Sequence, residues 1–242
     1  MQLFYTDYII EGMAMLPEEE SQHVIKVLRY KAGDKIFVTD GRGTLFEGTI
    51  YEAAAKECRV NLEILETREK DTPEVTIAIA PTKSRERFEN FIEKAVELGC
   101  TSIQPIWCDH SERKHARTDR WEKIALAAMK QSLHLYLPQI LPPISFKEML
   151  GQADEGAQKL ICWLGEDEPS ALLEEVYDPK GSSIIAIGPE GDFSEDEADL
   201  AKAKGWTPVS LGHYRLRTET AGISVMASAR IMHEQYLRQK AD

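Results

Sequence analysis

The segment YRLRTETAG, residues 214–222, places two arginines and a glutamate at the start of an expected helix. Arg217 is not explained by the helix itself, because a cation at a helix N-terminus opposes the helix dipole. Its guanidinium stays protonated and offers a planar set of donors, which suits an anion or developing negative charge. The alternatives are pairing with Glu190 or with Glu219. Arg217 is therefore a candidate for chemistry rather than for helix stability.

Glycines follow apolar runs in three late segments of the chain. The segments are WLGEDEPS (163–170), IGPEGDFSEDE (187–197) and SLGHYRLRTETA (210–221). In an open α/β sheet, ligands bind beyond the carboxyl ends of the strands. One such loop is an ordinary turn between a strand and a helix, but three of them close together in the sequence predict a shared ligand cleft.

Part of the acidic character of the middle loop has a structural explanation. Ser194 and Glu197 have the S-x-x-E spacing of a capping box, and acidic residues are favourable in the first turn of a helix. Thr218 is expected to cap the last helix in the same way. Glu190 and Asp192 are left without a structural explanation.

The common phosphate and metal motifs are missing from the sequence. It has no G-x-x-x-x-G-K-[ST], no G-x-G-x-x-G after a strand and no H-E-x-x-H. An EF-hand starting at Asp192 would need Gly and Glu where Glu197 and Ala203 stand. Cys58, Cys100, Cys108 and Cys162 are scattered without a C-x-x-C pair, so we expect free thiols and no metal site. These absences weaken the hypothesis of a metal-dependent nucleotide enzyme.

The residue patterns predict two domains joined by a linker at 67–73. Residues 1–70 are β-rich, with a glycine turn at 40–43 and one helix within 18–29. From residue 74 onward, strands alternate with helices, which predicts a parallel sheet covered on both faces. The expected strands are 74–80, 102–107, 159–164, 182–188 and 208–212, and the expected helices are 85–99, 119–132 and 219–238.

Composition places the chain among soluble globular proteins. It has 242 residues, 43% hydrophobic and 29% charged, with a formal net charge of −12. No apolar run is long enough to span a bilayer, and the start does not have the pattern of a signal peptide, so a cytoplasmic protein without a membrane partner is expected. The acidic total argues against nucleic acid, but basic residues cluster at 26–35 and 112–123.

Several of these segments together resemble one protein family. IGPEGDFSEDE followed by LGHYRLRTETA is similar to the motifs of bacterial ribosomal RNA small subunit methyltransferase E, the 16S ribosomal RNA uridine-N3 methyltransferases of the SPOUT class. HVIKVLR (23–29) and EKAVELGCTSIQPIW (93–107) resemble other segments of this family. This chain differs from the family at one place. The family usually has an arginine between the KQS segment and the following proline, whereas this chain has LHLYLP, with His134 near that position.

The resemblance implies an α/β fold with an N-terminal PUA-like β-barrel (1–70) and a C-terminal SPOUT domain with a deep trefoil knot (74–242). It also implies S-adenosylmethionine as cofactor, which has no phosphate and whose positive sulfonium is compatible with Glu190. The implied cofactor residues are Leu164, Gly165, Ile187, Gly188, Pro189, Glu190, Gly191, Leu211, Gly212, Leu216, Arg217, Thr218 and Ala221. Valine at Gly188 or Gly191 is expected to fill the slot or to need a disfavoured φ.

The implied partner is 16S ribosomal RNA or the small ribosomal subunit. His23, Arg29, Arg113 and Arg120 are the candidate RNA-binding residues, with His134 replacing the family arginine. Arg217 is the candidate catalytic residue, and Glu219 is either a general base or a group that orients it. A non-catalytic RNA-binding protein is the alternative function.

The resemblance further implies a homodimer formed through the last helix. This helix has more apolar residues than one sheet-facing side requires, although packing on its own sheet is the alternative. The residues are Ile223, Val225, Met226, Ala229, Met232 and Tyr236.

Overall fold

The protein divides into two compact units in this computed structural model, which describes residues 1–70, 73–112, 115–163 and 171–241. The first unit comprises residues 1–70 together with 127–137, and the second comprises the rest of the chain. The division after residue 70 falls inside the expected linker. The return of residues 127–137 to the first unit was not expected from the sequence.

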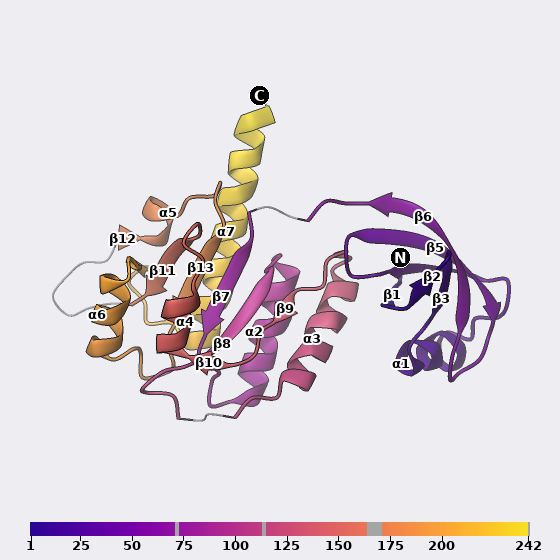
Figure 1. Cartoon of the computed structure of the whole chain (residues 1–242), viewed down its shortest axis with the longest axis horizontal. Coiled ribbons are helices and arrows are strands. Elements are labelled where there is room, and N and C mark those ends of the chain that lie inside the picture. Colours follow the sequence, from indigo (N-terminus) through magenta and orange to yellow (C-terminus); the bar gives the residue numbers. More distant parts are fainter. Residues whose placement is uncertain (71–72, 113–114, 164–170, 242) are drawn as a thin grey trace. The chain divides into compact units, whose positions relative to one another are not determined.

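The first unit contains a curled sheet that, in its described residues, has six strands (Figure 1). The strand order is β1 (Leu3–Tyr5), β4 (Lys35–Thr39), β5 (Thr44–Glu52), β6 (Arg59–Thr67), β3 (Met13–Met15) and β2 (Ile9–Ile10). The expected hairpin is confirmed, because β4 and β5 are antiparallel and flank the turn at 40–43. Register shifts between β5 and β6 at Leu45/Phe46 and Ile50/Glu52 bend these long strands. Apolar side chains such as Phe4 and Val38 then fill the concave side.

The expected helix within 18–29 is interrupted after its first turn. The α-helix α1 covers Glu18–Gln22, and a π-helix, η1, covers His23–Val27. The wider π-turn changes which side chains share a face. Val24 is buried, whereas Val27 is 67% exposed, so these two valines do not lie on one apolar face as they would in a regular α-helix.

Residues 127–137 are held to the first unit by backbone hydrogen bonds. Gly43 N donates to Leu135 O at 2.9 Å, and Leu137 N donates to Gly41 O at 2.9 Å. The Lys130 ammonium also pairs with the buried carboxylate of Glu20. The glycine turn at 40–43 therefore forms hydrogen bonds with a segment nearly one hundred residues away in the chain.

The second unit is an α/β structure around a parallel sheet. Within the described residues the order is β10 (Ile144–Ser145), β8 (Ser102–Trp107), β7 (Val75–Ile79), β13 (Ser183–Ile187), β11 (Gln158–Cys162), β14 (Thr207–Ser210) and β12 (Ala171–Leu172). The short strand β9 (Gln139–Ile140) also pairs with β8. All these pairings are parallel, as the alternation of strands and helices predicted.

Helices cover both faces of this sheet (Figure 1). Their bounds are α2 Arg85–Glu97, α3 Thr118–Gln131, α4 Phe146–Gln152, α5 Leu173–Val176, α6 Glu195–Ala203 and α7 Thr218–Ala241. Ala78 and Ala186 pack in one core cluster with residues of α4 and α6. Because strand side chains alternate, Ile79 points to the opposite face, where α2 and α7 pack against each other. Gly222 makes that contact possible, since a Cβ there would lie 2.5 Å from the Phe91 ring.

Helix α2, which agrees with the expected helix at 85–99, buries one apolar face. In α2, Phe88, Phe91, Ile92 and Ala95 are all buried. None of the helices in the described residues is long and apolar enough to cross a membrane.

Candidate active site

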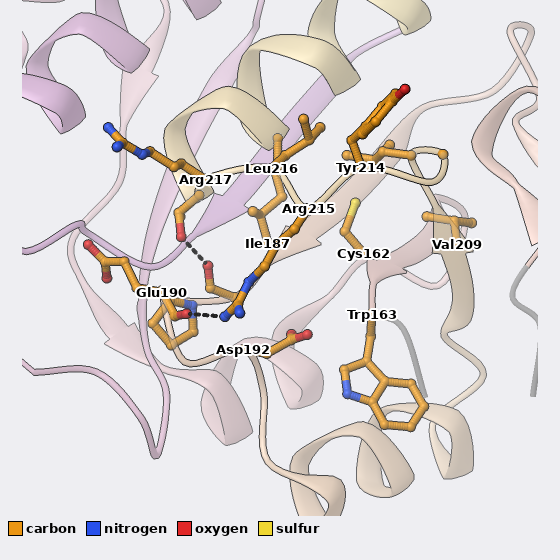
Figure 2. A pocket seen from close by; sticks show the side chains of 16 residues that line it. Cys162, Trp163, Ile187, Glu190, Asp192, Val209, Tyr214, Arg215, Leu216 and Arg217 are labelled. Carbon is orange, nitrogen blue, oxygen red and sulfur yellow. Dashed lines mark hydrogen bonds between the residues drawn. The ribbon is translucent and has the colours of Figure 1, made fainter. Parts of the chain in front are cut away.

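Three neighbouring parallel strands end at the same edge of the second sheet. Cys162, the last residue of β11, pairs with Ile187 at the end of β13 and with Val209 near the end of β14. The segments that follow these strands therefore begin side by side. They enclose, together with the start of α7, a cavity of about 300 Å³ (Figure 2).

Most of the expected cofactor residues line this cavity. They are Ile187, Gly188, Pro189, Glu190, Leu211, Gly212, Leu216, Arg217, Thr218 and Ala221. Gly191 is not part of the lining, and Leu164 and Gly165 lie outside the described residues. Two of the three predicted segments, 187–197 and 210–221, therefore meet at one cavity, whereas residues 164–170 of the third lie outside the described residues.

The cavity also has walls that the sequence analysis did not assign to it. These residues are Cys162, Trp163, Asp192, Val209, Tyr214 and Arg215. Each adjoins or lies within a predicted loop, so the ends of the apolar runs were the available signal. Tyr214 is 86% exposed at the mouth of the cavity, and Figure 2 shows its ring on the opposite side from the Arg217 guanidinium.

The loop between β13 and α6 is tied down by Glu190. The Glu190 carboxylate accepts a hydrogen bond from Lys83 N at 2.9 Å. Its backbone carbonyl accepts one from the Arg215 guanidinium at 3.4 Å (Figure 2). Glu190 thus connects the loop after β7 with the loop before α7, and the hypothesis that it pairs with Arg217 has no support in these contacts.

The same loop enters α6 through the predicted capping box. Ser194 Oγ accepts from Glu197 N at 3.2 Å, and Glu197 accepts from Ser194 N at 3.0 Å. Glu197 has a second function, because its other carboxylate oxygen accepts from Asp109 N at 3.0 Å. The His110 ring nitrogen Nδ1 lies 3.1 Å from Gly191 O and 3.0 Å from Asp192 O. Carbonyl oxygens only accept, so Nδ1 carries the proton there.

Asp192 and Cys162 both line the cavity, and the pKa of each side chain is raised. Asp192 adopts a φ of +64°, unusual for a residue other than glycine. Partial burial raises the pKa of its carboxyl group, and the Phe193 N–H and the Arg215 charge oppose that rise. Burial of the sulfur, with the Asp192 charge, raises the pKa of the Cys162 thiol to about 12. Cys162 is therefore protonated near neutral pH, and its sulfur is a poor nucleophile.

Gly188 and Gly191 do not have the backbone conformation expected for them. Neither has a positive φ. An added Cβ would lie 3.1 Å from Phe193 at Gly188 and 3.1 Å from His110 at Gly191. A larger residue would thus press on these neighbours rather than require a disfavoured φ, and that part of the prediction is wrong. The left-handed conformation lies instead at Gly212, where φ is +107° and the space around a Cβ is open.

The start of α7 differs from the predicted capping arrangement. Thr218 is the first helical residue, and its hydroxyl donates to Gly188 O at 3.0 Å instead of capping the helix. Arg217 precedes the helix, and its carbonyl accepts from Ala221 N at 2.8 Å. Within the described residues the exposed Arg217 guanidinium has no hydrogen-bonding or ion-pair partner.

Glu219 lies on the other side of the helix start, outside the cavity lining. It is 9% exposed, and its carboxylate is 3.7 Å from Arg87 Nε. The structure therefore brings Arg217 into the cavity and places Glu219 beside Arg87.

The candidate RNA-binding residues are divided between the two units. His23, Arg29 and His134 belong to the first unit, and Arg120 belongs to the second. His23 packs edge-on against Phe4, whereas Arg29 is exposed with a φ of +61°. Arg120 pairs with Glu89 at 3.1 Å, and Arg113 lies outside the described residues.

The cavity-forming part of the chain matches a known sequence family. The family described as "RNA methyltransferase domain" matches residues 68–230, and the one described as "RNA methyltransferase PUA domain" matches residues 16–63. Ribosomal RNA small subunit methyltransferase E of Synechocystis is 31% identical over 94% of this chain and 76% of its own length. This chain belongs to that methyltransferase family.

Solved structures of similar proteins have the same fold. A probable rRNA-methyltransferase from Porphyromonas gingivalis is 38% identical, with a TM-score of 0.88 over 98% of this chain and 100% of its own. A ribosomal RNA small subunit methyltransferase E from Neisseria gonorrhoeae, bound to S-adenosyl methionine, is 27% identical, with a TM-score of 0.86 over 96% of this chain and 98% of its own. The family's mixed α/β architecture thus extends over both units.

Proposed function

We propose that this protein transfers a methyl group from S-adenosylmethionine to N3 of a single uridine in 16S ribosomal RNA. The observation that carries the proposal is the cavity at the carboxyl ends of β11, β13 and β14, formed by the segments that resemble the family's cofactor loops. A formed cavity with polar groups at its edge supports a catalytic protein over a non-catalytic RNA-binding one.

The residues of the cavity fit this cofactor. Its volume of about 300 Å³ is in the range of small-molecule sites. Its walls include the apolar side chains of Ile187, Val209 and Leu216, which suit an adenine ring. Glu190 and Asp192 provide negative charge near a positive sulfonium. Leu164 and Gly165 are proposed to complete the site.

Arg217 is the proposed catalytic residue. The bound cofactor supplies an electrophilic methyl group. Uridine N3 has a proton, so it becomes a good nucleophile only when negative charge can spread to the uracil carbonyl oxygens. The unpaired Arg217 guanidinium offers two parallel donors to such an oxygen and stays charged throughout. Holding the base in line with the methyl group provides the remaining acceleration.

The proton on N3 must leave during the reaction. Glu219 was proposed either as the base or as the group that orients Arg217. Glu219 contacts Arg87 and does not line the cavity, so these contacts support neither its function as a base nor its function in orienting Arg217. A water molecule at the cavity mouth is the simpler proton acceptor. The target base must be unpaired or flipped out of an RNA helix before it can reach the cavity.

The finer fold and RNA-binding assignments also belong to this proposal. Residues 1–70 form a PUA-like β-barrel that binds RNA, and residues 74–242 form a SPOUT domain with a deep trefoil knot. The curled sheet and the match to the PUA family support the first assignment. His23, Arg29, Arg113, Arg120 and His134 are the proposed RNA contacts, and a cytoplasmic location follows from a ribosomal substrate.

A homodimer formed through α7 completes the proposal. Val225, Met226 and Ala229 are buried within their own unit, as the alternative of packing on the sheet predicted. Ile231 and Leu237, farther along the same helix, are 57% and 45% exposed. These two side chains support a partner helix on that part of α7.

Methyl transfer to defined RNA tests the proposed function. The full chain is incubated with S-adenosylmethionine carrying a labelled methyl group and with small ribosomal subunits, or free 16S RNA, from a strain that lacks the enzyme. We expect label on N3 of one uridine, mapped by mass spectrometry of RNA fragments. Label on a ribose or on guanine would contradict the uridine-N3 assignment. Cofactor binding without transfer to either substrate would favour the non-catalytic alternative.

A further inference from the structure

A second, smaller cavity lies in the same unit as the cofactor cavity. We call it the basic pocket and define it by Lys83, Arg85, His115 and Arg117 around a floor of Phe88 and Trp121. Lys83 lies in the loop after β7 and Arg85 at the start of α2. His115 and Arg117 lie in the segment before α3. Neither the cofactor nor the proposed chemistry uses this pocket.

The charges of the basic pocket are not balanced. Its carboxylate, Glu89, is already paired with Arg120 at 3.1 Å, and Lys83 pairs with Glu112 at 2.7 Å. In the described part of the chain, the side chains of Arg85, His115 and Arg117 have no hydrogen-bonding or ion-pair partner. Two arginine side chains without a counterion among the described residues are unusual in a protein with a net charge of −12. It favours an anionic ligand.

The size of the pocket limits what that anion can be. Its volume is about 50 Å³. A cavity needs roughly 10–15 Å³ for each water-sized group, so the pocket holds a group of about four heavy atoms. The five heavy atoms of a phosphate group are close to that size, whereas a nucleobase is too large.

The surroundings of the pocket strengthen its preference for an anion. Phe88 and Trp121 are 1% and 5% exposed, and their rings are 4.7 Å apart, so the floor is rigid and apolar. Charges act more strongly beside such a floor than in water. The pocket also adjoins the N-terminus of α2, where Ser84 makes no side-chain capping bond. The positive end of a thirteen-residue helix therefore adds to the side-chain charges.

Lys83 connects the basic pocket to the cofactor cavity. Its side chain lines the pocket, while its backbone N–H donates to Glu190, which lines the cavity, at 2.9 Å. If one residue of a polyanion lies at the cavity, the anionic group of a neighbouring residue can therefore reach the basic pocket. Single-stranded RNA has this spacing of phosphates along its backbone.

We propose that the basic pocket binds a phosphodiester of the substrate RNA next to the target uridine and so positions that base over the cofactor cavity. This inference rests on the proposed function and assigns a substrate contact within it. Arg85 and Arg117 hold the phosphate oxygens through charge-assisted hydrogen bonds. Arg120 acts indirectly, because it keeps Glu89 neutralised.

The test compares the full-length wild type with the Arg85→Gln/Arg117→Gln double variant. Binding to unmethylated small subunits and to 16S RNA is measured at several salt concentrations, with cofactor affinity measured separately by calorimetry. Losing one phosphate contact should reduce the slope of log affinity against log salt by about 0.7. RNA affinity should fall roughly tenfold at low salt. Cofactor affinity should not change.

Lys204→Gln is the control for the loss of positive charge elsewhere on the surface, because Lys204 lies at the end of α6, outside both cavities. Equal RNA affinity and salt slope in the double variant and the wild type would overturn the inference, provided that the wild type methylates RNA. Absence of methylation by the wild type would instead contradict the proposed function. If inorganic phosphate stabilised the wild type but not the double variant while RNA affinities were equal, the pocket would be a free-phosphate site and the RNA assignment would fail.

Discussion

The Thr218 hydroxyl donates a hydrogen bond of 3.0 Å to the carbonyl of Gly188, thirty positions earlier in the chain. Gly188 follows β13 and Thr218 begins α7, so this bond joins two separate walls of the cofactor cavity. Both groups are buried. The shape of the cavity therefore depends on one side-chain donor that was expected to cap a helix.

Thr218→Val should weaken cofactor binding and stability together. Valine keeps the shape but leaves the buried Gly188 carbonyl unsatisfied, which costs about 1–3 kcal/mol. Urea unfolding and calorimetry with S-adenosylmethionine measure the two effects. Thr207→Val, the same change at an exposed strand residue, is the control and should affect neither quantity. A Thr218→Val protein with wild-type stability and cofactor affinity would show that the bond is unimportant.

Gly212→Ala should distort the loop after β14. Its φ of +107° is unfavourable for alanine although the surrounding space is open, and such strain costs about 1–3 kcal/mol. Because Gly212 lines the cavity, cofactor affinity should also fall. Gly205→Ala is the matched control, with a φ of +79°, open space and no place in the cavity lining. We expect Gly205→Ala to lose similar stability without losing cofactor affinity. Equal cofactor affinities in the two variants would contradict the placement of Gly212 at the cofactor site.

Arg217→Ala should reduce methyl transfer by about a hundredfold or more, because it removes a donor aimed at developing charge. Cofactor affinity should change far less, so single-turnover rates and calorimetry separate the two effects. Arg217→Lys keeps the charge but loses the planar set of donors and should not restore the rate. Wild-type turnover by Arg217→Ala would exclude Arg217 from catalysis.

Cys162 should react slowly with iodoacetamide although it is partly exposed at the cavity wall. Its thiol pKa of about 12 lies above that of free cysteine, so thiolate is scarce at pH 8 and increases as the pH rises. The alkylation rate at pH 8 should be roughly a thousandfold below that of free cysteine. It should increase tenfold per pH unit up to about pH 11, whereas free cysteine reaches a plateau above about pH 9.

S-Adenosylmethionine should slow this alkylation further if it occupies the cavity. Mass spectrometry of the Cys162 peptide gives the rate, with the buried Cys100 as an internal reference. Equal rates with and without saturating cofactor would contradict the proposed cofactor site without any measurement of activity.

Ile231→Asp should convert the proposed dimer to a monomer, because it places a charge on the exposed apolar part of α7. Light scattering at micromolar concentration measures the mass. Thr207→Asp, at an exposed strand position outside α7, is the control and should stay dimeric. A wild-type protein that already has monomer mass would contradict the assembly itself.

The periodicity of the sequence predicted the long elements of the second unit because these are locally determined, whereas the short elements β9, β10, β12, α4 and α5 were not predicted. The apolar face of α2 and the run that becomes β13 needed no distant contact to be identified. The first unit was harder to predict, because the π-turn at His23–Val27 and the return of residues 127–137 depend on packing. The Ser194–Glu197 capping box was predictable because both partners lie within one turn.

The sequence by itself determined that the segments 187–197 and 210–221 follow strands of a parallel sheet, because glycines come after apolar runs in both, and residues of both segments line the cavity. The order of the strands, which brings these segments together, came from the structure. The tertiary structure decided which partner each polar group takes. Glu190 bonds to Lys83, Thr218 to Gly188, and Glu219 lies beside Arg87. Arg217 lines the cavity, and its guanidinium has no partner among the described residues. The pocket of Arg85 and Arg117 likewise required the structure. The physical reason is that side-chain pairing depends on distances between segments far apart in the chain, and local residue patterns do not contain those distances.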